Sequence, residues 1–237
     1  MLEKEDWEQN KKMNITFYGH ACFGIEVNGI HIIVDPFITG NPKASHIDIA
    51  SLEADYILVT HAHQDHVLDV EEIAKRTGAI IISNYEIVNH FLDKDVKGHH
   101  LNHGGTFSCK EFSAKYVNAI HTSSFADGSY GGQPGGFILT ANNNSIYIAG
   151  DTAVSFDMKL IPLFATLTAA ILPIGDTFTM GVEEAIIASD FIECNKIIGC
   201  HFNTFPPIEI NIDDAKQQFK LKSKELILLE IGSSIEL

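Results

Sequence analysis

"ILVTHAHQDHVLD", residues 57–69, places three histidines and one aspartate within six positions, directly after a short apolar run. The segment "DYILVT" (55–60) predicts a buried strand, and "VLDVEEIAKRTG" (67–78) predicts a helix that ends at a glycine. In an extended segment His61 and His63 point to the same side, because side chains alternate with a period of two. Asp65 and His66 lie past the bend where the helix starts, so two pairs of polar side chains face one cavity.

These four side chains are good metal ligands. Neutral imidazoles combined with a carboxylate suit Zn²⁺, and Mn²⁺ or Fe²⁺ fits the same set. The alternative is a solvated loop that happens to be rich in histidine, because the chain holds 12 histidines in 237 residues. The placement at the end of a buried strand favours metal ligands over a solvated loop. The two pairs of side chains point in different directions, which favours two ions, and two ions need further ligands from elsewhere in the chain.

Three isolated residues supply such candidates, each at the end of a strand-like run. His121 closes "YVNAIH", Asp151 closes "SIYIAGD" and His201 closes "KIIGCH". Loops at the carboxyl ends of strands are where sites in layered α/β folds gather. Taken singly, each residue could instead cap a turn; taken together with the first motif, they favour a metal site.

A second histidine cluster, "HHLNHGG" (99–105), lacks this strand-end placement and spacing. We interpret it as a surface turn, with His103 as a weak candidate for the rim of the pocket.

The wider pattern predicts one domain of layered sheets with outer helices over residues 13–237. Asn28-Gly29 is a hairpin signal, and a second hairpin crosses "ANNN" between two strand-like runs. Apolar residues recur with a helical period over 182–193, before a strand at 196–200. The charged stretch 1–12 reads as a disordered leader.

The composition restricts the partners. With 31 acidic and 16 basic residues the formal charge is −15, which disfavours nucleic acid and anionic membranes. The four cysteines are scattered without a CxxC pair, and no apolar run resembles a signal peptide or a membrane span. We expect a cytoplasmic protein that acts on a small molecule. A homo-oligomer is compatible with the sequence, which shows no specific interface signature.

Several motifs together resemble a known family. "THAHQDH" (60–66), "AGDT" (149–152) and "GCHFNTFP" (199–206) resemble the successive motifs of the metallo-β-lactamase superfamily. "ITFYGHACF" (15–23), "DPFITGNP" (35–42), "NAIHTSS" (118–124) and "LPIGDTFTMG" (172–181) resemble its branch of metal-dependent hydrolases similar to ascorbate-6-phosphate lactonase. The resemblance covers Met13 to about Pro206. It implies an α/β fold, an αββα sandwich of two mixed sheets packed face to face with helices outside.

The resemblance also implies roles for individual residues. His61, His63 and His121 would hold the first metal, Asp65, His66 and His201 the second, and Asp151 would bridge the two. Asp35 would be a hydrogen-bonding partner that orients the histidines. His20 would reach the substrate or the metal rim, unless it is a packed structural histidine.

Two divalent ions, most readily Zn²⁺, would lower the pKa of a shared water and provide a bridging hydroxide as the nucleophile. Asp65 would orient the water or carry a proton to the leaving group. We expect a small ester, lactone or phosphodiester as substrate, with Asn41, Thr179 and Asn203 among its contacts. No cluster of Arg or Lys adjoins the motifs as a phosphate clamp.

Three other functions remain open at this point. Some members of the superfamily use iron for redox chemistry, and its nucleases share these ligands. A non-catalytic metal-binding module is the third alternative, although the presence of all seven candidate ligands argues against it.

Overall fold

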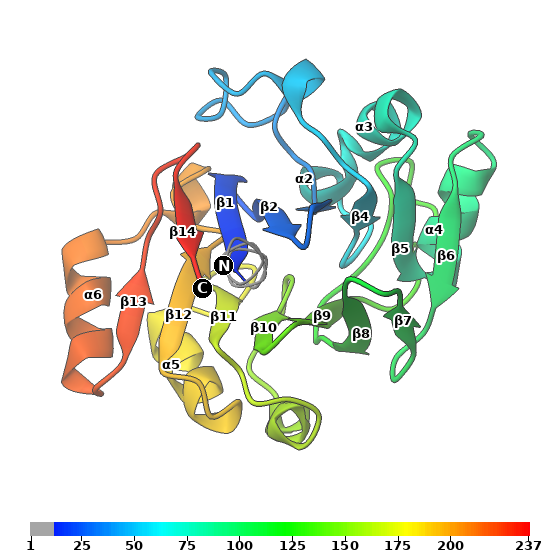
Figure 1. Cartoon of the computed structure of the whole chain (residues 1–237). Helices are drawn as coiled ribbons and strands as arrows, with labels where there is room; N and C mark the ends of the chain where they lie inside the picture. Colours follow the sequence, from blue (N-terminus) through cyan, green and yellow to red (C-terminus); the bar gives the residue numbers. More distant parts are fainter. Residues whose placement is uncertain (1–11) are drawn as a thin grey trace, which may run out of the picture.

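The computed structural model describes residues 12–237 and forms two seven-stranded sheets that pack face to face (Figure 1). The leader expected over residues 1–12 lies outside the described residues, except for Lys12. Both sheets are mixed, because each contains parallel and antiparallel pairs. The predicted αββα sandwich is confirmed.

The strands of the first sheet, in spatial order, are β14 (Ser234–Glu236), β1 (Met13–Gly19), β2 (Cys22–Val27), β3 (Ile30–Val34), β4 (Tyr56–Leu58), β5 (Ile80–Asn84) and β6 (Gly98–Leu101). Those of the second are β13 (Glu225–Ile227), β12 (Lys196–Cys200), β11 (Ala169–Pro173), β10 (Asn144–Ile148), β9 (Gly135–Ala141), β8 (Ser113–Asn118) and β7 (Thr106–Ser108).

Local sequence signals explain where the strands turn. Asn28 and Gly29, with φ of 53° and 76°, form the two-residue turn between β2 and β3, as the hairpin signal predicts. In β1, buried and partly exposed residues alternate along the whole strand. One face of this strand therefore packs on the core while the other lies nearer to solvent.

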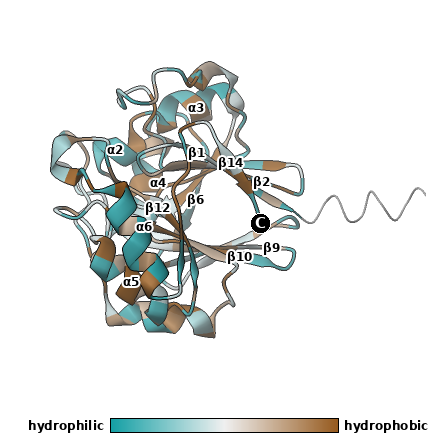
Figure 2. Cartoon of the chain, turned by 90° about the vertical axis from the view of Figure 1, so that its left-hand side faces the viewer, coloured by the Kyte–Doolittle hydropathy of each residue, from teal (hydrophilic) through white to brown (hydrophobic). Residues whose placement is uncertain are grey.

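Helices cover the outer faces of both sheets (Figure 2). They are α2 (Gln64–Val67), α3 (Val70–Thr77), α4 (Tyr85–Leu92), α5 (Val182–Phe191) and α6 (Ile212–Leu221), with short 3₁₀ helices η1 (Ile49–Ser51), η2 (Phe156–Leu163) and η3 (Pro206–Ile208). The helix predicted over 67–78 is interrupted at Asp69 and ends, as expected, at Gly78 in a left-handed conformation. No helix within residues 12–237 is both long and apolar enough to cross a membrane.

The buried apolar side chains form three layers. One cluster, which includes Phe23, Tyr116 and Phe137, lies between the sheets. A second lies beneath α5 and α6, and a third beneath α3 and α4. Because both faces of the central strands are covered, strands such as β11 are buried at every position. Polar side chains can gather only where these strands end.

Candidate metal centre

The histidine motif occupies the turn between β4 and α2. The extended residues Thr60 to His63 lead into α2, and His63 caps its first turn in an extended conformation. His61 and His66 are fully buried, whereas His63 is partly exposed. The chain reversal at Gln64 therefore directs His61 and His66 toward each other, with ring centroids 4.1 Å apart.

Asp151 lies at the centre of the cluster, in the turn after β10. Gly150 precedes it with a φ of 63°, and a Cβ there would approach the Thr60 Cβ to 2.8 Å and the Gly135 carbonyl oxygen to 2.9 Å. Only glycine therefore lets the two sheets approach this closely. The Asp151 Oδ2 lies 3.1 to 3.8 Å from the Nε2 atoms of four histidines: His201, His66, His121 and His61.

The candidate ligands form three overlapping groups, of which one is Asp35 with His61 and His66. In another, ligand atoms of His61, His63 and His121 all lie within 4.8 Å of one another. In the third, atoms of His20, Asp65, His66 and His201 do so. The structure thus brings together all seven residues expected as ligands, three on each side of Asp151, and adds His20 to the group that contains Asp65.

Asp35 determines which nitrogen of two histidines faces the cluster. Its Oδ2 accepts hydrogen bonds from His66 Nδ1 at 2.9 Å and from the Thr60 hydroxyl at 2.6 Å. Because that hydroxyl has only one proton, it accepts from His61 Nδ1, 3.0 Å away. Both imidazoles therefore keep a proton on Nδ1 and turn Nε2 toward Asp151, so Nε2 is the atom available to a metal ion, which would displace any proton bound there.

His20 holds Asp65 in a similar way. Its Nε2 donates to Asp65 Oδ2 at 3.0 Å, while its Nδ1 accepts from the Thr204 hydroxyl at 2.9 Å. Burial lowers the pKa of His20 to about 4, so the ring is neutral. His20 is 2% exposed and does not reach the cavity surface, which places it behind Asp65.

Three residues of the cluster adopt left-handed backbone conformations that non-glycine residues seldom use. The φ values are 56° for His20, 43° for Asp35 and 53° for His201. The His201 backbone N–H donates to the His20 carbonyl at 2.8 Å, which ties two of these turns together across the sheets. Such strain is typical of sites whose geometry the surrounding fold determines.

The charges in the cluster are strongly coupled. Burial would raise the pKa of Asp151, but His66 and His201 hold it well below its usual value. Burial opposes protonation of His201, yet Asp151 and Asp65 raise its pKa to about 9, and Asp151 and Asp35 raise the pKa of His66 well above the usual value. Burial and the neighbouring imidazoles lower the pKa of His61. The carboxylates thus stabilise positive charge on the neighbouring imidazoles of His66 and His201.

Buried side-chain atoms that lack a hydrogen-bond partner indicate whether a cation fits the cluster around Asp151. His66 Nε2 and Asp151 Oδ1 are buried without a hydrogen-bond partner among the described residues. Leaving such atoms unpaired costs about 1–3 kcal/mol each. A set of imidazoles and carboxylates with free lone pairs suits divalent ions such as Zn²⁺, so the residues present fit a metal centre.

The cluster opens into a cavity of about 370 Å³. Its lining residues are His63, Asp65, His121, Thr122, Asp151, Phe178, His201 and Phe205. Phe178 is 57% exposed, so its ring is available to a ligand. The two aromatic rings make this a partly apolar pocket above charged ligands, a composition common in small-molecule sites.

The three expected substrate contacts lie around this cavity without lining it. Asn41 is buried, and its Oδ1 accepts from the Lys43 backbone N–H. The Asn203 Oδ1 accepts from the Ile210 backbone N–H at 2.7 Å, and Thr179 bonds the Met180 carbonyl. These side chains hold the surrounding loops, and their contact with substrate stays a prediction.

The second histidine cluster was misinterpreted in part. Gly98–Leu101 forms the edge strand β6, not a turn, because it pairs in parallel with β5. His103 Nε2 contacts the Pro134 carbonyl at 2.9 Å, and its ring stacks on Tyr116. It lines a different hollow from the one beside Asp151.

Sequence reasoning missed two residues of the site, Thr60 and Thr204. Each hydroxyl sets the tautomer of a histidine. Thr60 adjoins His61 in the motif, so its proximity was a usable signal. Nothing local connects Thr204 with His20.

Known proteins resemble this chain over most of its length. Residues 14–201 match the family described as the beta-lactamase superfamily domain. The chain is 60% identical over 226 residues to a UPF0173 metal-dependent hydrolase of Christiangramia forsetii, covering 95% of this chain and all of that protein.

Solved structures show the same fold. Igni18, a metallo hydrolase from the archaeon Ignicoccus hospitalis, matches with a TM-score of 0.87 and 31% identity over 95% of this chain and 98% of that one. CmlA, a diiron β-hydroxylase from Streptomyces venezuelae, matches with a TM-score of 0.74 over 95% of this chain and 54% of its own. At 14% identity, the likeness to CmlA shows the fold alone.

Proposed function

The chain belongs to the metallo-β-lactamase superfamily and is a metal-dependent hydrolase, and from this premise we propose that it uses two divalent ions to hydrolyse a small ester, lactone or phosphodiester. One ion would be held by His61, His63 and His121, the other by Asp65, His66 and His201, with Asp151 between them. The observation that carries the proposal is the position of Asp151 Oδ2, 3.1 to 3.8 Å from four histidine Nε2 atoms.

Divalent ions bound here, most readily Zn²⁺, would supply a water activated at neutral pH and a Lewis acid for the scissile bond. Asp65 is suited to orient the attacking water as a hydrogen-bond acceptor, because its side chain is 32% exposed and lines the cavity. Burial opposes its charge, but hydrogen bonds from His20 and His201 hold its pKa far below the usual value. His20 then acts as a positioning residue that fixes the Asp65 carboxylate.

Water fits the role of nucleophile better than any side chain near the cluster. Cys200 precedes His201, but it is buried in the layer between the sheets, and burial raises its pKa well above the usual value. A thiol in this state is inert. No serine or cysteine lines the 370 Å³ cavity among the described residues.

The cavity favours neutral esters and lactones over phosphomonoesters. Among the described residues, its lining includes no Lys or Arg to pair with a dianion. Phe178 and Phe205 instead offer apolar contact near the metal ligands. A lactone of a sugar phosphate is correspondingly less well supported.

Metal content tests the proposal. Elemental analysis of protein purified without added metal should give close to two ions per chain for the wild type. Asp151→Asn should lose at least one ion, because it removes the shared charge, whereas Asp127→Asn, on an exposed loop, should retain both. One ion or none in folded wild type contradicts the two-metal arrangement.

Activity then distinguishes the reactions. Zinc-loaded protein should hydrolyse p-nitrophenyl acetate or a simple lactone, with little oxygen uptake by the iron-loaded protein in the presence of thiols. Oxygen uptake without ester or lactone hydrolysis would favour the redox alternative.

A further inference from the structure

Phe178 lies in the loop 174–181, which joins β11 to α5 beside the metal centre. Its side chain lines the 370 Å³ cavity, and the residue is 57% exposed. Among the described residues, its ring contacts no other aromatic ring and no cation. A large apolar side chain that is exposed over a ligand cavity is available to an apolar part of a ligand.

The beginning of this loop is packed against the strand end that carries His201. A Cβ on Gly175 would lie 2.1 Å from the His201 carbonyl oxygen, so only glycine permits this approach. The Ile174 backbone N–H donates to the Cys200 carbonyl at 3.0 Å. The loop therefore starts at a fixed distance from one of the proposed metal ligands.

The end of the loop is fixed beside Asp151. The Met180 backbone N–H donates to the carbonyl of Thr152 at 3.0 Å, and Met180 is 1% exposed. Phe178 thus lies between two anchors, one next to His201 and the other next to Asp151.

The turn before Phe178 is also held by hydrogen bonds. Asp176 and Thr177 have φ values of 61° and 58°, which a β-branched residue seldom adopts. The Thr177 backbone N–H donates to Asp176 Oδ1 at 2.7 Å, and the Thr177 hydroxyl donates to the Pro207 carbonyl at 2.8 Å. These bonds fix the backbone that directs Phe178.

Phe205 is the other aromatic residue of the cavity, and its segment is joined to the loop of Phe178 through Pro207. Its ring lies edge-on to His20, with centroids 5.5 Å apart. Both rings line the cavity, yet they do not contact each other among the described residues. The cavity therefore has two separate apolar side chains beside the metal ligands.

The rest of the lining offers little to a polar substrate. Besides the proposed metal ligands, the described residues that line the cavity are Thr122, Phe178 and Phe205, so a single hydroxyl is the only other polar side chain. The several hydroxyl groups of a sugar would lose hydrogen bonds to water without gaining partners here. An apolar group loses nothing in the same place.

We infer that Phe178 is a specificity-determining residue, whose ring contacts an apolar group next to the scissile bond, so that the protein prefers esters or lactones with an apolar ring over sugar-like ones. The inference deepens the proposed hydrolase function and rests on it. A volume of 370 Å³ is near the lower end of the range for ligand sites, which suits one such ring beside the scissile bond.

A pair of lactones tests the inference on the zinc-loaded protein. 3,4-Dihydrocoumarin and δ-valerolactone share a six-membered lactone ring, and only the first carries a benzene ring. Phe178→Ala should lower kcat/KM for dihydrocoumarin by at least about tenfold, or about 1.4 kcal/mol, and that for δ-valerolactone by less than about threefold. Each variant is compared with the wild type on the same substrate, so the different reactivities of the two lactones cancel.

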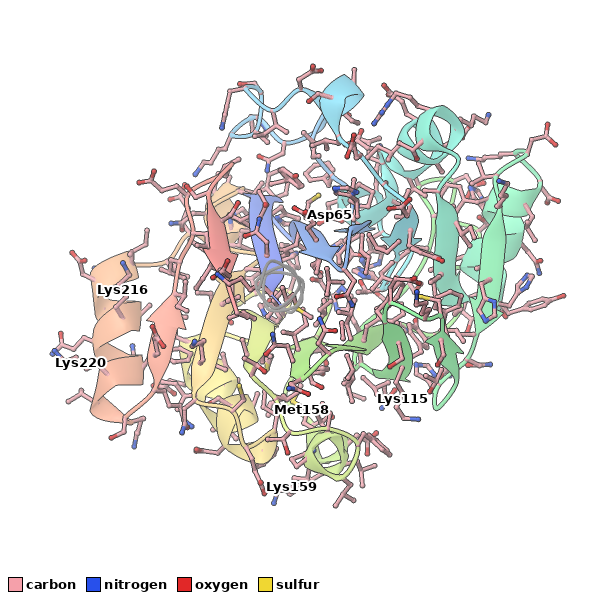
Figure 3. The ribbon with its side chains drawn as sticks, in the orientation of Figure 1. Asp65, Lys115, Met158, Lys159, Lys216 and Lys220 are labelled. Carbon is pink, nitrogen blue, oxygen red and sulfur yellow. The ribbon has the colours of Figure 1, made fainter. Side chains whose placement is uncertain are left out.

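Phe164→Ala is the matched control. Phe164 is 52% exposed and does not line the cavity. The Lys115 ammonium lies 4.7 Å from the Phe164 ring centroid, and Figure 3 shows Lys115 well apart from Asp65. This variant should hydrolyse both lactones like the wild type. Zinc content should be unchanged in Phe178→Ala, because the anchors of the loop are backbone groups and the Thr177 hydroxyl.

Binding can be observed without hydrolysis. Benzoate and acetate present the same carboxylate to the metal centre, and only benzoate adds a ring. By calorimetry, benzoate should bind the zinc-loaded wild type at least about tenfold more tightly than acetate, and Phe178→Ala should reduce this ratio below about threefold. Phe164→Ala should leave the ratio unchanged.

The outcomes separate the two levels of the proposal. Equal losses on both lactones, or loss of zinc from Phe178→Ala, assign Phe178 a structural role and overturn the inference, while the hydrolase function stands. Tighter binding of benzoate that depends on Phe178, without hydrolysis of either lactone, supports the apolar contact and contradicts the hydrolase proposal. Sedimentation that shows a dimer in the wild type and a monomer in Phe178→Ala assigns the ring to a contact between copies and overturns the inference.

Discussion

Two histidine-rich regions of the molecule look alike as sequences and differ in the structure. The motif at residues 61–66 follows the central strand β4, and His61 and His66 are buried beside Asp151. His99 and His100 lie on the edge strand β6 and are exposed. His100 contacts Asn89 at 2.9 Å, and His99 packs against Phe107. Neither belongs to a cluster of ligand atoms among residues 12–237.

The difference shows what makes a histidine a candidate ligand. Strand β4 has neighbours on both sides and both faces covered, so the residues after it meet turns from the other sheet. Strand β6 ends its sheet, and its side chains meet solvent or the nearest ring. Convergence of several chain segments, and not histidine content, therefore distinguishes the metal centre.

The largest expected effect separates the two regions directly. His66→Ala should lower kcat/KM by at least about a hundredfold if His66 binds metal as proposed, because loss of a metal ligand removes several kcal/mol of transition-state stabilisation. His100→Ala should stay within about twofold, because surface substitutions have small effects. Steady-state ester hydrolysis with zinc-loaded proteins measures both. Equal losses of kcat/KM in the two variants would contradict the proposed difference between the two histidine regions.

Asp35→Asn tests the surroundings of the histidines separately, because it leaves every proposed metal ligand in place. The substitution weakens the acceptor for His66 Nδ1 and the Thr60 hydroxyl, so zinc affinity should fall by about 10–100-fold. Competition with a chromophoric chelator measures this affinity. An unchanged affinity would mean that Asp35 only packs the loop.

The pH dependence should also separate metal-free from metal-loaded protein. The pKa of His201 rises to about 9 in the folded state and that of His66 rises too, so these two imidazoles bind more protons in the metal-free fold than in the unfolded chain. Their contribution to stability is therefore fully present below about pH 6.5 and declines as pH rises toward 9. Metal binding displaces these protons, so zinc affinity should increase with pH over the same window, by up to about tenfold per unit for each proton released.

Calorimetry in buffers of different ionisation enthalpy measures that proton release. Urea unfolding of the metal-free protein at pH 6.5 and 9 measures the opposite trend in stability. Greater stability at pH 9 would contradict the assigned charges.

The smallest effects lie within the second histidine region. His103→Ala should lower the free energy of unfolding by about 1 kcal/mol, because it removes one part-buried hydrogen bond and a stacked ring. His100→Ala should change it by less than about 0.5 kcal/mol. Urea titration of metal-loaded protein measures both. A loss above 2 kcal/mol for His100→Ala would show that β6 contributes more to the fold than its edge position indicates.

Much of the fold followed from local signals. The hairpin at Asn28-Gly29, the helix end at Gly78 and the strand at 196–200 are each decided by a few neighbouring residues. The edge strand β6 was missed because its pairing with β5 is not encoded in "GHHL" itself. The parallel partner is distant in the chain, and parallel strands carry no turn signal between them.

The sequence by itself indicated layered sheets with outer helices and the residue types available as ligands, because strand periodicity and motif spacing are local properties. The αββα arrangement was implied by the resemblance of its motifs to the metallo-β-lactamase superfamily. Only the tertiary structure decided that Asp151 lies among four imidazoles and that Asp35 and Thr60 orient two of them, His61 and His66. Those relations are distances between residues far apart in the chain. Such distances follow from how the two sheets pack, which no short segment specifies.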